Sequence, residues 1–170
     1  MEYKKYLFLI VWLLYGTIGF SQETNPLNTE AFYDSIEFDN ICLSKIIEIH
    51  QATGSLESIF SSSDTKNTNA NGSPFDTINY KINGSLFSFE DSDETGDKKL
   101  YNIAYVKFGN NTQIKLFDGT TFRIGDSSSE LDKFKKLDTN KIVFNQIDTG
   151  TSLRIEIDNN VISAVKIVFY

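Results

Sequence analysis

The fold prediction is decided by the C-terminal fifty residues, TFRIGDSSSELDKFKKLDTNKIVFNQIDTGTSLRIEIDNNVISAVKIVFY, residues 121–170. Ser127 and Glu130 have the S-x-x-E spacing of a capping box, and the apolar residues that follow predict a helix over 127–137. Three strand-like runs come next, separated by turn residues at 148–150 and 158–160. The last strand, 161–170, is apolar on both faces, which predicts a covered strand. This stretch therefore reads as a helix followed by an antiparallel meander.

The residues upstream follow the same plan more loosely. Leu43 to Ala52 predicts a helix, with Ser44 as its N-cap and Gly54 as its C-terminal stop. Further strands are expected at 78–82, 86–89, 100–108, 113–117 and 120–124. Asn83-Gly84 is a strong hairpin signal, because both central residues of a type I′ turn need positive φ. The polar run 61–73 is expected to be a mobile loop.

These patterns predict an α+β protein with antiparallel sheet, since helices and strands do not alternate as βαβ units. We expect two tandem helix-plus-antiparallel-sheet units with strands joined by tight hairpins, residues 40–117 and 118–170. The polar segment 22–39 is expected to be a flexible leader before the first unit.

The N-terminus has the features of a secretory signal. A short charged region with Lys4 and Lys5 precedes the uncharged apolar run from Tyr6 to Phe20. That run is shorter than the ~20 residues a membrane span needs. Small residues at Gly19 and Ser21 predict cleavage after Ser21. The sequence thus predicts a secreted or periplasmic protein without stable membrane insertion after cleavage, and an uncleaved anchor is the other interpretation.

Charge and cysteine content narrow the possible partners. The chain carries a net charge of −7, and removal of residues 1–21, which carry +1, leaves −8. An acidic chain repels phosphate backbones, which argues against nucleic-acid binding. The single cysteine, Cys42, excludes an internal disulfide and lies far from the position where a lipoprotein is acylated. We interpret Cys42 as a buried small hydrophobe.

Two short motifs carry the resemblance to a known family. The segment IGDSSSEL (124–131) precedes the strands, and NVISAV (160–165) begins the last strand. Together they resemble the repeat of the SmpA/OmlA small outer-membrane assembly lipoproteins. A tandem pair of such units is similar in plan to the β-lactamase inhibitor protein fold. The resemblance implies an interaction module that performs no catalysis.

Candidate chemistry is sparse. The acidic segment Asp91–Asp97 has Asp at positions one and three and Gly at six of an EF-hand loop, but Asn102 stands where a bidentate Glu is needed. We interpret it as a solvated hairpin loop and keep a loose calcium site as the alternative. Cys42 and His50 would lie ~12 Å apart along a helix. They therefore predict no catalytic dyad, and His50 is expected to be structural. We predict no cofactor.

Aromatic residues suggest a binding surface. Most of them should form core, but a subset on the outer sheet face would make a platform for protein or glycan. The candidates are Tyr80, Phe87, Phe89, Tyr101 and Tyr105. Our main hypothesis is an exported non-catalytic protein that binds another envelope or extracellular protein through a sheet face. The alternative is a small secreted hydrolase or glycan-active enzyme that uses surface carboxylates.

Overall fold

A computed structural model describes residues 24–59, 64–69, 76–91 and 96–169, and these form two antiparallel-rich sheets with short helices. The predicted signal segment, residues 1–21, lies outside the described residues. The mixed helix and sheet content agrees with the predicted α+β class. Among the described residues, no helix is both long and apolar enough to cross a membrane.

The large sheet has nine strands within the described residues. Their spatial order is β1 (Asn25–Leu27), β11 (Lys141–Gln146), β12 (Ser152–Asp158), β13 (Val161–Val168), β7 (Asn102–Lys107), β6 (Ser85–Glu90), β5 (Asp76–Ile82) and β4 (Asp64–Asn69), with β10 (Lys136–Asp138) also paired to β11. The small sheet has the order β3 (Ile41–Cys42), β2 (Glu37–Phe38), β8 (Ile114–Lys115) and β9 (Thr121–Phe122). The helical elements are α2 (Thr29–Tyr33), α3 (Leu43–Thr53) and the 3₁₀ turns η1 (Lys98–Leu100) and η2 (Ser128–Leu131).

One apolar row crosses the large sheet and defines its inner face. Directly paired residues of antiparallel strands point to the same side, so a ladder of partners is a row on one face. The row is Phe144, Leu153, Ile167, Val106, Phe87 and Tyr80. Every member is at most 2% exposed. The core therefore lies against this face along six neighbouring strands.

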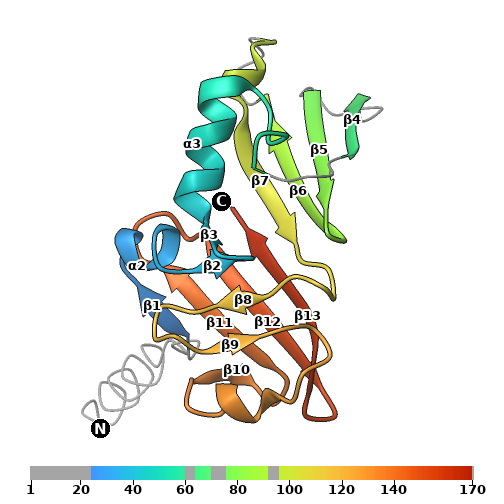
Figure 1. Ribbon diagram of the computed structural model, residues 1–170. Coiled ribbons are helices and arrows are strands. Elements are labelled where there is room, and N and C mark those ends of the chain that lie inside the picture. Colours follow the sequence, from blue (N-terminus) through green and yellow to red (C-terminus); the bar gives the residue numbers. More distant parts are fainter. Residues whose placement is uncertain (1–23, 60–63, 70–75, 92–95, 170) are drawn as a thin grey trace, which may run out of the picture.

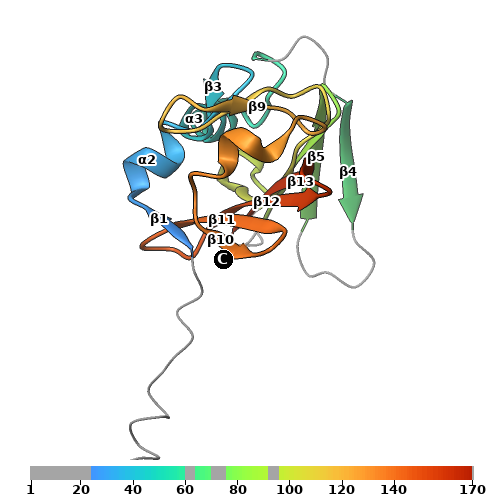
Figure 2. The ribbon, with the colours of Figure 1, turned by 90° about the horizontal axis from the view of Figure 1, so that it is seen from below.

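The opposing layer consists of α2, α3, the small sheet and η2. Figure 1 shows α3 beside β7, the small sheet in front of β11 to β13, and α2 at the edge next to β1. Figure 2 shows these elements on one side of β11–β13, with no described element on the other side. Phe38 of the small sheet stacks on Phe108, with ring centroids 4.4 Å apart. The large sheet thus has one covered face and one outer face.

Helix α3 forms as the sequence predicts, with a different N-terminus. Its buried residues Leu43, Ile46 and His50 lie on one face. Gly54 ends it in the left-handed conformation at φ 70°, and the Gly54 N–H donates to His50 O at 2.7 Å. The N-cap is Cys42, not the predicted Ser44, and Cys42 makes no side-chain cap bond. Cys42 is half-buried and not fully buried as the sequence predicts, and its sulfur lies 3.3 Å from Ser44 Oγ.

The predicted hairpins are confirmed at their turns. Asn83 and Gly84 have φ of 50° and 83° between β5 and β6, as a type I′ turn requires. Asn159 and Asn160 do the same between β12 and β13, with φ of 50° and 62°. Asparagine tolerates this region better than other residues with a side chain. These turns fix the register in which the inner apolar row is continuous.

The segment 22–39 was expected to be a flexible leader, and its described part is instead ordered. Strand β1 pairs in parallel with β11, and the Asn25 side chain donates to Lys135 O at 2.9 Å and to Val143 O at 3.1 Å. Asn28 caps α2 by accepting from the Ala31 N–H at 2.7 Å. Phe32, Ile36 and Phe38 are buried. The polar composition of this segment predicts a flexible chain, but three buried apolar residues are enough to attach it to the core.

The helix predicted over 127–137 is wrong. Only the 3₁₀ turn η2 forms, with Ser127 as its cap and Leu131 buried. Residues Lys136–Asp138 form β10 and pair with the edge of β11, so they are not free to continue a helix. An isolated helix of this length is marginal in water. Strand pairing therefore decides the conformation of this segment.

The two predicted units do not separate in the structure. The boundary between residues 117 and 118 falls inside the small sheet, where β8 pairs with β9. Strands β13 and β7, from the two halves, pair in the large sheet. Part of the expected loop 61–73 is strand β4, paired with β5, and the rest of that loop lies outside the described residues.

Candidate functional site: the outer face of the large sheet

Four of the five aromatic residues proposed as a binding face are buried. Tyr80 is 1% exposed, Phe87 2%, Phe89 1% and Tyr101 4%. Tyr80 and Phe87 belong to the inner apolar row, and Phe89 packs on α3 through a stack with His50. Only Tyr105 is half-exposed. The prediction that these aromatic residues form a binding face is therefore wrong. Alternation along a strand separates its two faces, but it does not indicate which face is covered by the rest of the protein.

Basic side chains form a row across the outer face. On each strand, the residue next to the inner row points to the outer face. These residues form a second row of paired positions: Val143, Arg154, Lys166, Lys107 and Leu86. Arg154 pairs with Lys166, and Lys166 pairs with Lys107, so three cations occupy directly opposed positions on adjacent strands. Their Cβ atoms are about 5 Å apart in such pairs. We call Arg154, Lys166 and Lys107 the basic row.

Two carboxylates lie at the margin of the basic row. Lys166 Nζ is 2.9 Å from Glu156 Oε1, and Lys141 is the cross-strand partner of Glu156. The Lys166 hydrogen bond, followed by the charges of Lys141 and Arg154, lowers the pKa of Glu156 even though its partial burial opposes this. Asp138 on β10 pairs with Lys141. Around the basic row, four cations thus face two carboxylates, which makes this part of the outer face positive although the chain has a net charge of −7.

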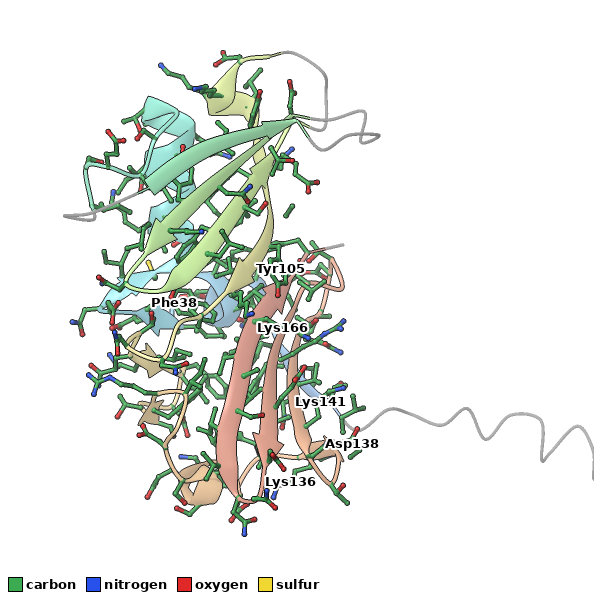
Figure 3. All side chains as sticks on the ribbon, turned by 90° about the vertical axis from the view of Figure 1, so that its right-hand side faces the viewer. Phe38, Tyr105, Lys136, Asp138, Lys141 and Lys166 are labelled. Carbon is green, nitrogen blue, oxygen red and sulfur yellow. The ribbon has the colours of Figure 1, made fainter. Side chains whose placement is uncertain are left out.

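Lys107 is the least compensated member of the row. Among the described residues, no carboxylate oxygen lies within 4 Å of its amino group, and its side chain is exposed. Its ladder partners are Lys166 on one side and Leu86 on the other. Tyr105, two residues earlier on the same strand, pairs with Val168 and lies on the same face. Figure 3 shows Tyr105, Lys166 and Lys141 following one another along the large sheet, on the opposite side from Phe38.

A cleft of about 350 Å³ lies on this face at the β11–β12 end. Its lining includes Lys141, Arg154, Asn145 and Ser152. The Arg154 Nε–H donates to Ser152 Oγ at 3.0 Å, which orients the guanidinium. Guanidinium, ammonium, amide and hydroxyl groups all donate hydrogen bonds, and they match the oxygen atoms of an anion. Among the described residues, the side chains that line this cleft include no carboxylate.

The other sequence candidates form no site. His50 is fully buried, and the Cys42 sulfur contacts Ser44, so no Cys42–His50 dyad is assembled. In the acidic loop, Asp91 is buried and accepts from the Gly96 N–H at 2.6 Å. Residues 92–95 of that loop lie outside the described residues. Over the part of the chain that the structure describes, no three His, Cys, Asp or Glu side chains gather as metal ligands.

The basic row was missed because its members are scattered in the sequence. Lys107 lies about sixty residues before Lys166, and each is an unremarkable strand lysine on its own. The alternation around Arg154 and Glu156 is visible, but it does not reveal the neighbouring strand. Comparison of the chain with protein-family models, with curated proteins and with solved structures found no match.

Proposed function

We propose that this chain is an exported, non-catalytic binding protein that uses the outer face of its large sheet to hold an acidic segment of another envelope or extracellular protein. The observation that carries the proposal is the basic row of Arg154, Lys166 and Lys107. The row stands on the outer sheet face of an acidic chain, and no described element packs over it (Figure 2).

The basic row has an energetic cost in the free protein. Like charges in directly opposed strand positions destabilise a sheet by a few tenths of a kcal/mol to about 1 kcal/mol. Glu156 relieves Lys166, but no described carboxylate reaches Lys107. A carboxylate from a partner would neutralise this repulsion. Relief of this repulsion would therefore add to the binding energy, and a face with alternating charges would offer no such gain.

The shape and the neighbours of the row suit a protein partner. Arg154 and Lys141 meet in the cleft at one end, where an Arg–carboxylate pair can be bidentate. Tyr105 adds a half-exposed aromatic ring beside the cations. Aromatic residues and arginine are enriched where protein interfaces carry their binding energy. The proposed surface spans strands from both halves of the chain.

Two features of the sequence support the cellular setting. The N-terminal segment is typical of a cleavable secretory signal, and cleavage after Ser21 would release a chain that begins just before Thr24 and β1. The resemblance of residues 124–131 and 160–165 to the SmpA/OmlA repeat favours protein binding over catalysis. Envelope and extracellular proteins are therefore the proposed class of partner.

Binding of a labelled hexaglutamate peptide tests the proposal. Because the chain is acidic overall, mean-field electrostatics predicts repulsion of this probe and attraction of hexalysine. The basic row predicts the reverse order in fluorescence anisotropy. The affinity for hexaglutamate should decrease as the NaCl concentration is raised from about 50 to about 500 mM, because salt screens exposed charges over that range.

Charge reversal at one position provides the control. K107E should abolish hexaglutamate binding, whereas K99E changes the net charge equally at an exposed site on η1 and should leave it intact. Equal losses in both variants would show a general charge effect and overturn the proposal. An anionic polysaccharide or anionic vesicles that bind more tightly than the acidic peptide, with the same sensitivity to K107E, would refute a protein partner.

A further inference from the structure

A second cleft has a volume of about 280 Å³. It is formed by α2, α3, the start of β7, the turn between β11 and β12, and Phe169. Tyr33 and Tyr101 supply two further aromatic rings to its walls. The volume is near the lower limit of small-molecule sites, about 300 Å³, and suits a single ring.

The described lining combines apolar and polar side chains, and none of them is charged. Gln51, Asn102, Thr149 and Thr151 contribute two amides and two hydroxyl groups, and no Lys, Arg, Asp or Glu among the described residues lines the cleft. Nearly a quarter of the chain's residues are charged, so an uncharged concavity is a distinctive local environment. The Gln51 amide and the Tyr33 hydroxyl make no hydrogen bond within the described part of the chain. Donors and acceptors are therefore available beside aromatic rings.

One edge of this cleft is held by a buried glutamine. Gln146 is 1% exposed, and its Nε2 donates to Thr29 Oγ1 at 2.9 Å. Its Oε1 accepts from the Thr149 N–H at 2.7 Å and from the Thr149 hydroxyl. Thr149 Oγ1 also lies 2.9 Å from Thr151 Oγ1. The buried Gln146 side chain thus holds the Thr149 hydroxyl beside that of Thr151.

We propose that this cleft binds one ring of a neutral glycan. A sugar ring has apolar C–H faces that stack on aromatic rings, and hydroxyl groups that bond to amides and hydroxyls. A charged ligand would lose hydration in the cleft without meeting a counter-charge. A purely apolar ligand would bury the Gln51 amide without giving it a hydrogen-bond partner. The site is separate from the basic row and does not depend on it.

The test is a titration of the ¹⁵N-labelled mature chain with glucose, galactose and N-acetylglucosamine, followed by amide chemical shifts. A single ring with few hydrogen bonds binds with a Kd of about 1 mM or weaker, so the titrations extend to about 50 mM. We expect saturable shifts for at least one sugar at amides of Gln51, Thr149 and Thr151. Glucuronate, an anionic sugar, should bind less tightly than the neutral sugars.

Two variants of the lining decide whether the shifts report this cleft. Q51A should weaken binding about three- to tenfold, the value of one neutral hydrogen bond, and Y33F should weaken it to a similar extent. Gln51 is exposed, so its replacement leaves the fold intact, and Q113A serves as the same-type control elsewhere. No saturable shift for any neutral sugar, unchanged affinity in both lining variants, or tighter binding of glucuronate would each overturn the proposal.

Discussion

The single histidine of the chain makes stability measurably dependent on pH. His50 is fully buried on α3 and stacks on Phe89, with ring centroids 3.8 Å apart. Neither ring nitrogen has a hydrogen-bond partner among the described residues. Burial lowers the pKa of His50 to about 4. The folded state therefore holds the neutral imidazole over most of the physiological range.

The sign and size of the effect follow from proton linkage. The unfolded chain binds a proton at His50 near pH 6.5, whereas the folded chain does so only near pH 4. Stability is therefore full above pH 6.5 and is lost as the pH falls through that value toward 4. Between about pH 7.5 and pH 5 the difference in protonation lowers the free energy of unfolding by about 2 kcal/mol.

The assay is urea unfolding of the wild type and of H50Q at both pH values, with the same m-value analysis. H50Q keeps a polar side chain but cannot titrate, so about 2 kcal/mol of the pH dependence should disappear. H50F, which keeps the stack on Phe89 and removes the unpaired nitrogens, should raise stability at pH 7.5 by about 1–3 kcal/mol. If H50Q unfolds with the same pH dependence as the wild type, His50 is hydrated or paired, and the reasoning fails.

Three further substitutions test other parts of the structure. K107E should stabilise the fold by a few tenths of a kcal/mol to about 1 kcal/mol, because it replaces a like-charge neighbour of Lys166, and a loss of stability in urea unfolding would contradict the basic row. G109A should lower the free energy of unfolding by more than about 2 kcal/mol, because a Cβ at this position would overlap the Gly84 backbone. G119A should lower it by only about 1 kcal/mol, because Gly119 has positive φ but open space around it. Equal shifts of the two variants in thermal unfolding would refute the close approach of Gly109 and Gly84. Q146A should cost about 1–3 kcal/mol by unpairing Thr29 and Thr149, and a neutral result in thermal unfolding would disprove the buried network.

Local signals in the sequence predicted local structure well. The Asn83-Gly84 turn and the Gly54 stop of α3 are properties of a few neighbouring residues, and both are confirmed. The failures concern pairing at a distance. Nothing near Lys136 indicates that it joins the edge of β11, and nothing near Asn25 indicates a parallel partner. Local propensity cannot compete with such contacts, because they are formed only in the assembled sheet.

The same limit explains the candidate site. Alternation in β5 and β6 correctly placed aromatic residues on one face, yet α3 covers that face, and its position depends on tertiary packing. The charged residues on the outer face form a row only because of the strand register, which places Lys107 beside Lys166 and Lys166 beside Arg154. Two paired lysines from distant segments are invisible to a reading along the chain.

The central claim is that the basic row holds an acidic partner segment, and amide chemical-shift mapping tests it most directly. The ¹⁵N-labelled mature chain is titrated with hexaglutamate at low salt. The largest shifts should fall on β12, β13 and β7, at Arg154, Lys166, Lys107 and Tyr105, and should vanish in K107E. Shifts centred on other strands, or none at saturating peptide, would contradict it.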